Sequence, residues 1–318
     1  MEEKIIGLLK KEGGYLSGEG LSRSLKISRQ ALWKHIQAIR EMGFDIAAVP
    51  HLGYRLISEP DKLYDFQVYH GLKTKTLGRS ALYFDSLSST MDTAAQLALK
   101  GAKEGTIVVA ETQIKGRGRL GRLWHSPKYK GLYFSIILKP KIPLDKAPVI
   151  TLLTAVSISE ALKELIPIDI QIKWPNDLIL NNKKIGGILT EIKAEIDEVG
   201  FVIVGVGLNI NNDKKTLFSG ATSLSLELGD KLSRVQVLQG ILHRLEENYL
   251  VFNKKGSLTI TDKWRQQSIT LGKRVKIYSH KECIEGEAVD IDSDGGLLVR
   301  RDNGLTQKVT SGDVIHCR

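Results

Sequence analysis

A basic segment spaced by glycines is the part of the chain best suited to hold a small anion. Residues 111–124 read ETQIKGRGRLGRLW, in which Arg117, Arg119 and Arg122 alternate with glycines. Glycine allows a backbone to lie close to a ligand, and the arginine guanidinium matches the oxygens of a phosphate or a carboxylate. Apolar segments on both sides predict two buried strands. We therefore expect a flexible loop that closes over an anionic ligand, although a solvated basic loop or a loop on a nucleic-acid backbone would have the same composition.

A second polar segment interrupts a pair of predicted strands. Residues 170–192 read as two strands joined by a turn at 181–182, and the first contains the pentapeptide Lys-Trp-Pro-Asn-Asp. Pro175 lacks a ladder donor and belongs at an edge or a bulge. Asn176 and Asp177 lie inside an apolar run, so each needs a structural partner or a ligand.

Glycines recur close to this segment. Lys184 comes just before Ile-Gly-Gly, which ends at Gly187, and a buried strand over 200–210 carries Gly205 and Gly207 on one face. Such positions leave room for a ligand or a neighbouring backbone. Earlier in the chain, Ser-Ser-Thr at 88–90 begins a helix over 91–100. Free N–H groups and hydroxyls at that start could bind an anion, although plain N-capping explains the same residues.

The N-terminal segment predicts a separate small domain. Two short helices, a third helix over 29–42 capped by Ser28, and two strands at 44–49 and 53–57 follow the winged helix-turn-helix order. The third helix would enter the major groove of DNA. A small helical interaction domain with an ordinary charged surface is the alternative interpretation, because such patterns also arise by chance.

Composition restricts the class of protein. The 318 residues carry a net charge of +10 and are 42% hydrophobic and 26% charged, values typical of a soluble globular protein that binds anionic partners. The N-terminus lacks a signal-peptide pattern, and no apolar run approaches the ~20 residues of a membrane helix. With only Cys283 and Cys317 and no CxxC, we expect free thiols, no zinc site and a cytoplasmic location.

The last segment predicts a small all-β domain. Short alternating strands occur at 274–278, 285–292, 296–300 and 306–309, and Asp-Gly-Gly and Asp-Asn-Gly supply tight turns between them. The chain thus divides into a DNA-binding domain over 1–65, a catalytic domain over 66–269 and a C-terminal domain over 270–318. Its predicted class is α+β.

The loop Gly-Arg-Gly-Arg-x-Gly-Arg, the pentapeptide and Lys-Ile-Gly-Gly-Ile-Leu occur in the order found in biotin–protein ligases, which the chain resembles over nearly its whole length. With the N-terminal segment, it is most similar to the bifunctional bacterial ligases that also repress the biotin operon. The resemblance implies a central mixed sheet with helices, of the class II aminoacyl-tRNA synthetase and biotin ligase type, and a C-terminal SH3-like β-barrel.

The resemblance also implies a two-step reaction. Biotin and ATP give biotinyl-5′-AMP, and a lysine of the biotin carboxyl carrier protein then accepts the biotin. Lys184 and Arg119 would be catalytic, because fixed cations must offset the charges of a carboxylate and a phosphate that meet. The implied biotin-binding residues are Ser89, Thr90, Met91, Gln113, Gly116, Arg117, Gly118, Arg119, Lys184, Gly187 and Gly205. The implied nucleotide-binding residues are Arg119, Arg122, Trp124, Asn176, Lys184 and Asn209.

Further partners follow from the same resemblance. Asp177 would bind Mg²⁺, and an adenylate-bound homodimer would bind operator DNA without any membrane contact. Family members often carry an arginine where this chain has Leu120, so that side chain is not required for the scheme. The residues expected to contact DNA are Ser28, Arg29, Gln30, Trp33, Lys34 and Arg55.

Two other functions compete with this one. A lipoate or octanoate ligase would share the central fold, but such enzymes lack the N-terminal domain and the paired motifs of this chain. A transcription regulator whose pocket only senses a ligand would account for residues 1–65 and the basic charge. It would not account for two cations that face a pocket lined by glycines.

Overall fold

The computed structural model describes residues 1–195, 198–278 and 283–316, and the chain forms two compact units. Unit 1 comprises Met1–Lys62 and unit 2 comprises Leu63–Arg318. The division lies just before the boundary expected at residue 65, because the N–H of buried Leu63 already donates to the carboxylate of Glu111 at 3.0 Å. Residues 270–318 belong to unit 2 by their contacts.

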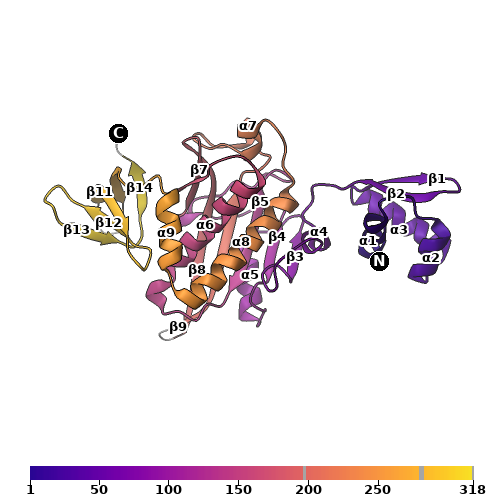
Figure 1. Cartoon of the computed structure of the whole chain (residues 1–318), viewed down its shortest axis with the longest axis horizontal. Coiled ribbons are helices and arrows are strands. Elements are labelled where there is room, and N and C mark those ends of the chain that lie inside the picture. The colour runs from indigo at the N-terminus through magenta and orange to yellow at the C-terminus, as the bar shows by residue number, and fades with distance from the viewer. Residues whose placement is uncertain (196–197, 279–282, 317–318) are drawn as a thin grey trace. The chain divides into compact units, whose positions relative to one another are not determined.

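Unit 1 has the predicted winged helix-turn-helix fold (Figure 1). The hydroxyl of Ser17 accepts from the Gly20 N–H at 3.0 Å, and the hydroxyl of Ser28 accepts from the Ala31 N–H at 3.1 Å, so both later helices begin at a serine cap. Apolar residues such as Ile36 are fully buried between the helices. The elements are α1 (Glu2–Glu12), α2 (Gly18–Leu25), α3 (Arg29–Glu41) and the antiparallel pair β1 (Asp45–Val49) and β2 (Gly53–Ser58).

A seven-stranded mixed sheet forms the centre of unit 2, in the order β3-β4-β5-β9-β8-β7-β6. β3 and β4 pair in parallel, and every other neighbouring pair in this order is antiparallel. The strands are β3 (Ala81–Phe84), β4 (Ile107–Ala110), β5 (Leu132–Leu138), β6 (Gln171–Lys173), β7 (Asp177–Leu180), β8 (Lys183–Glu195) and β9 (Glu198–Leu208).

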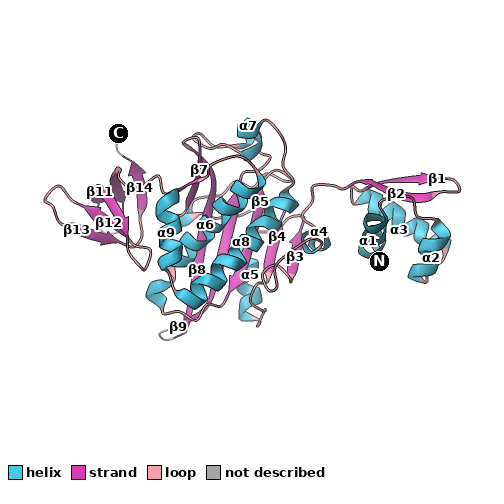
Figure 2. Cartoon of the chain, viewed as in Figure 1, coloured by secondary structure: helices cyan, strands magenta, loops and turns pink. Residues whose placement is uncertain are grey.

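Helices cover both faces of this sheet. Side chains alternate along a strand, so Val202 and Val204 of β9 enter the core with α6 and α8, while Ile203 packs with α5 on the opposite face. Figure 2 shows α6, α8 and α9 in front of the strands. Because α6 lies between the sheet and the other two helices, it is apolar around most of its circumference. The helices are α4 (Asp65–Tyr69), α5 (Thr90–Leu99), α6 (Pro148–Leu165), α7 (Leu224–Leu228), α8 (Arg234–Lys255) and α9 (Leu258–Gln267).

The C-terminal residues form the predicted small β domain as a five-stranded antiparallel sheet in the order β13-β12-β11-β10-β14. Trp174 joins it to the central sheet, since this buried indole donates to the Gly295 carbonyl at 3.0 Å. Arg265 of α9 adds an ion pair to Asp290 at 2.7 Å. The strands are β10 (Arg274–Tyr278), β11 (Cys283–Ile291), β12 (Leu297–Arg300), β13 (Thr306–Val309) and β14 (Asp313–His316).

The prediction of two strands over 170–192 was wrong. The segment forms three strands, and the cis peptide before Pro175 lies in the turn between β6 and β7. A turn suits proline because no ladder donor is needed there. The sequence analysis also missed α4, α9 and β14, which are short or lack a clear period.

The structure also bears on the predictions made for the cysteines and for membrane helices. Cys283 is an exposed free thiol, and Cys317 lies outside the described residues. Among the helices described, none combines the length and apolar character that crossing a bilayer requires.

Candidate active site

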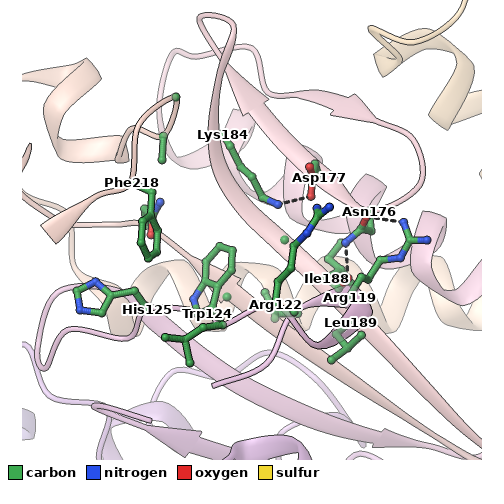
Figure 3. A pocket seen from close by; sticks show the side chains of 18 of the residues that line it. Arg119, Arg122, Trp124, His125, Asn176, Asp177, Lys184, Ile188, Leu189 and Phe218 are labelled. Atoms are coloured by element: carbon green, nitrogen blue, oxygen red, sulfur yellow. Dashed lines mark hydrogen bonds and ion pairs between the residues drawn. The ribbon is translucent and has the colours of Figure 1, made fainter. Parts of the chain in front are cut away.

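A pocket of about 890 Å³ lies over the face of the central sheet that carries α5. Its walls come from the start of α5, the basic loop after β4, the β6–β7 turn, the loop before α7 and the end of the C-terminal sheet. Figure 3 shows Lys184 and Arg122 extending into this space above Trp124, with Arg119 to one side beside Asn176. The sequence places these segments far apart, and the fold brings them together.

Glycines form the floor of the pocket. Gly187 of β8 pairs with Gly207 of β9, and Gly205 lies two residues earlier on the same face. A Cβ at Gly207 would lie 2.4 Å from the indole of Trp124, and one at Gly205 would lie 2.4 Å from the sulfur of Met91. The missing side chains therefore allow the indole and the thioether to rest directly on the sheet.

Replacing Gly207 with alanine should weaken ligand binding as well as the fold. The new methyl group would push Trp124 off the sheet, and overpacking of this kind costs the fold about 1–3 kcal/mol. A ligand that needs the indole on the sheet would lose roughly tenfold in affinity for each 1.4 kcal/mol spent on returning it there. Calorimetric titration with biotin measures the loss. Gly7→Ala in α1 is the control, since beyond its chain neighbours and the backbone of its own helix no atom lies within 4 Å of the added Cβ. Wild-type affinity in Gly207→Ala would show that the indole has no packing role in the pocket.

A chain of buried hydroxyls and one amide closes one end of the pocket. Ser135 donates to the Thr90 hydroxyl at 2.8 Å. Thr90 donates both its hydroxyl (3.0 Å) and its backbone N–H (2.9 Å) to the side-chain oxygen Oε1 of Gln113. The Gln113 amide nitrogen then donates to Ser126 at 3.2 Å. These bonds fix the orientation of the polar groups, which a neutral polar ring of a ligand could meet without reorganisation.

The ammonium group of Lys184 lies in the pocket. Its Nζ lies 2.5 Å from Asp177 Oδ1 and 5.7 Å from the centre of the Trp124 ring. The ammonium is partly exposed, so an incoming anion can compete with the aspartate for it. The indole N–H of Trp124 is buried and has no hydrogen-bond partner within the described part of the chain, which leaves a donor for a ligand.

Two arginines of the loop contact the C-terminal sheet. Arg119 donates to the Asn176 side-chain oxygen at 3.1 Å and to the Gly312 carbonyl at 3.3 Å. Burial lowers the pKa of Arg119, while Asp313 and Asp177 oppose this shift, and the guanidinium remains charged at neutral pH. Arg122 forms an ion pair with Asp313. The C-terminal sheet is therefore part of the pocket wall.

Most of the predicted ligand-binding residues meet in this pocket. Ser89 and Gly116 do not line it. Ser89 is buried and caps α5 by accepting from the Asp92 N–H at 3.5 Å, and a Cβ at Gly116 would meet the Trp124 carbonyl at 2.6 Å. The predicted residues that do line the pocket are Thr90, Met91, Gln113, Arg117, Gly118, Arg119, Arg122, Trp124, Asn176, Asp177, Lys184, Gly187, Gly205 and Asn209.

The sequence analysis missed other lining residues. Phe218 is 63% exposed, and its ring meets that of His125 at 5.9 Å. A lone exposed phenylalanine in a loop would have been a weak signal. Lys173 and His316 line the wall at the C-terminal sheet. Burial lowers the pKa of His316, and Lys173 adds to the effect, so the imidazole is neutral at pH 7.

The described residues do not form a dedicated metal site. No three His, Cys, Asp or Glu side chains among them come together. The predicted metal ligand Asp177 instead pairs with Lys184. A Mg²⁺ ion that arrives on nucleotide phosphates needs only one or two protein carboxylates.

The residues predicted to contact DNA lie together in unit 1. Arg29 begins α3 and pairs with Glu19 at 2.9 Å, and Trp33 is 54% exposed on the same helix. Arg55 of β2 is exposed, with its guanidinium 5.9 Å from the Tyr15 ring. Gln30 and Lys34 are also exposed, which leaves the surface of α3 accessible.

Known proteins match both units. Three family models match the chain: an HTH domain over residues 2–55, the biotin/lipoate A/B protein ligase family over 83–209 and the biotin protein ligase C-terminal domain over 270–317. A biotin protein ligase from Aquifex aeolicus, solved in complex with biotin and ATP, superposes with a TM-score of 0.65 at 31% identity, covering 76% of this chain and 99% of that one.

Full-length relatives include two bifunctional ligase/repressors. That of Bacillus subtilis, BirA, is 40% identical over 99% of this chain and 98% of its own length. The Escherichia coli BirA is 30% identical over 98% of this chain and 95% of its own. Identity at this level over both whole chains, with the three domain matches in one order, shows that the chain belongs to the BirA family of bifunctional biotin ligase/repressors.

Proposed function

We propose that this chain, an ATP-dependent biotin–protein ligase with an N-terminal DNA-binding domain, makes and consumes biotinyl-5′-AMP in the pocket of unit 2. The observation that carries the proposal is that Lys184, Arg119 and Arg122 line one pocket whose floor is formed by glycines. Biotin would lie with its polar ring toward Thr90 and Gln113. The nucleotide would lie toward Asn176 and the C-terminal sheet.

The first step joins two anions. A carboxylate oxygen of biotin forms a bond to the α-phosphorus of ATP, the bond to the bridging oxygen of the β-phosphate breaks, and pyrophosphate leaves. Lys184 would exchange its contact with Asp177 for the reacting oxygens, and Arg119 would hold the α-phosphate. Fixed cations in a site partly closed to water offset the repulsion and position both reactants.

The second step transfers biotin to a protein. A neutral lysine amine of the biotin carboxyl carrier protein attacks the carbonyl carbon of the adenylate, the bond from that carbon to the phosphate oxygen breaks, and AMP and a proton leave. Arg119 would again stabilise the departing phosphate. The scheme needs no covalent enzyme intermediate, because the activated anhydride already supplies the leaving group.

A pyrophosphate assay tests the proposal against its alternatives. Biotin and ATP should give a burst of pyrophosphate, and a carrier domain lacking biotin should convert the burst into steady release with biotin on one carrier lysine. Lipoate and octanoate are the comparison substrates. A burst with either of them and none with biotin would favour the lipoate-type ligase, and no burst with any acid would favour a protein that only senses its ligand.

The repressor role should depend on the adenylate. One winged helix covers one half-site, so tight binding to a two-fold operator needs two copies of the chain. Adenylate that orders the basic loop would lower the entropy cost of pairing two copies, and binding of adenylate and dimerisation would then favour each other. A carrier that consumes the adenylate would return the protein to a monomeric ligase in the cytoplasm.

Operator binding by the full chain should strengthen when a non-hydrolysable biotinyl-AMP analogue is added. Coupling of this kind typically amounts to roughly 5- to 150-fold in affinity. Fluorescence anisotropy measures the affinity for operator DNA. Sedimentation of the protein alone measures the monomer–dimer constant. An analogue that leaves both the operator affinity and the monomer–dimer constant unchanged would contradict the coupling. A mismatched duplex controls for non-specific binding by this basic protein.

A further inference from the structure

Arg117 ties the basic loop to two other elements at the biotin end of the pocket. One terminal nitrogen of its guanidinium lies 2.7 Å from Asp92 Oδ1 and 3.2 Å from Glu191 Oε1. Asp92 belongs to the first turn of α5, and Glu191 belongs to β8. A single arginine therefore bridges the loop, a helix and a strand.

The loop itself is a small hairpin with Arg117 at its base. Arg117 and Leu123 face each other as an antiparallel bridge, and the Gly118 N–H donates to the Arg122 carbonyl at 2.7 Å. Leu120 and Leu123 are 56% and 64% exposed, so apolar burial contributes little to holding this hairpin down. The closed position of the hairpin must therefore be stabilised mainly by its polar contacts with the rest of unit 2.

We propose that Asp92 and Glu191 are positioning residues that latch the hairpin through Arg117 and so set how long biotinyl-5′-AMP stays bound. The inference rests on the proposed function, because it concerns the intermediate of that reaction. Neither carboxylate lines the pocket. Their effect therefore acts on opening of the loop and not on the reacting atoms.

The size of the effect follows from exposure. The three side chains are 40%, 44% and 45% exposed, and an exposed ion pair is worth little in water. Two carboxylates that share one donor form a small network, in which ordering one side chain serves both contacts. Loss of either carboxylate should speed release of the adenylate roughly threefold, and loss of both about tenfold. Added salt should speed release from the wild type by a larger factor than from the double variant, because both still bind the adenylate through Lys184 and Arg119 but only the wild type has the latch charges.

The experiment measures the dissociation rate of synthetic biotinyl-5′-AMP from the full chain by chase with unlabelled adenylate. The latch charges are removed one at a time by Asp92→Asn and Glu191→Gln, and together by the double variant. Asp92→Glu keeps the negative charge at position 92. Asp302→Asn, which breaks the exposed ion pair with Arg274 in the C-terminal sheet, is the matched control. We expect faster release from the three latch variants, near wild-type release from Asp92→Glu, and no change in the control.

The outcomes separate the latch from the catalytic proposal. A double variant that releases adenylate less than twofold faster than the wild type, or an Asp92→Glu variant as fast as Asp92→Asn, would overturn the latch. Added adenylate makes this readout independent of whether the protein forms it. A pyrophosphate burst with biotin and ATP, measured on the same wild-type sample, reports the proposed function separately.

Discussion

Lys184→Ala should abolish measurable formation of biotinyl-5′-AMP while the fold survives. Lys184 provides a cation in the pocket, and its ammonium lies 2.5 Å from Asp177. Removal of the ammonium leaves the Asp177 carboxylate without its lysine partner, close to where the biotin carboxylate and the α-phosphate would meet. Repulsion between these anions rises, and the transition state loses a stabilising cation. The loss of one hydrogen-bond donor to a developing negative charge lowers the rate roughly 10²- to 10³-fold. The unpaired Asp177 carboxylate should lower the rate further. Single-turnover release of pyrophosphate measures the effect.

The neighbouring lysine supplies a matched control. Lys183 is exposed on the same strand and pairs with Glu227 at 3.3 Å, away from the pocket lining. Lys183→Ala makes the same change in net charge and should react at close to the wild-type rate. Equal losses in both variants would assign the effect to long-range charge, and a wild-type rate in Lys184→Ala would remove Lys184 from the mechanism.

Arg234→Met should destabilise the protein by about 3–5 kcal/mol. Arg234 and Glu111 are both fully buried and form an ion pair at 2.5 Å, and the arginine also donates to the Gly131 carbonyl at 3.1 Å. Breaking the pair from one side leaves Glu111 as an uncompensated buried charge. Urea unfolding of the full chain, followed by far-ultraviolet circular dichroism, measures the lower midpoint.

Two comparison variants show whether burial causes this effect. Arg244 lies on the same helix as Arg234, is half-buried and pairs with Glu164 of α6, so Arg244→Met breaks a pair that water reaches and should change stability by less than about 1 kcal/mol. Glu111→Leu combined with Arg234→Met removes both charges and should recover much of the stability lost in the single variant. A single variant as stable as Arg244→Met would show that water reaches the pair.

Local patterns made much of the fold predictable. Ser28 caps α3 because its hydroxyl needs only a backbone N–H three residues ahead, and the sequence shows that spacing. Gly205 and Gly207 were expected on one face because strand side chains alternate. The loop, the pentapeptide and Lys184 were assigned to one ligand by the resemblance to biotin–protein ligases, because no local pattern relates these three segments.

Contacts between distant residues could not be predicted this way. Nothing near Arg119 in the sequence indicates that Gly312 supplies an acceptor, since 193 positions separate them. The same holds for Glu111 and Arg234, which are 123 positions apart and form an ion pair in the core. Four of the five C-terminal strands could be predicted, but β14, whose Asp313 and His316 line the pocket, was missed, and its place in the wall depends on how two sheets pack.

The contacts of Gly312 and Asp313 with Arg119 and Arg122 also bear on synthesis of the protein. During translation, the loop, the pentapeptide and Lys184 are added to the chain more than a hundred residues before these two positions. A nascent chain therefore contains the cations that we propose to be catalytic long before the strand that completes the pocket wall is made. Formation of biotinyl-5′-AMP by a nascent chain should therefore stay slow until β14 has been made. Unfinished chains would then consume little biotin and ATP.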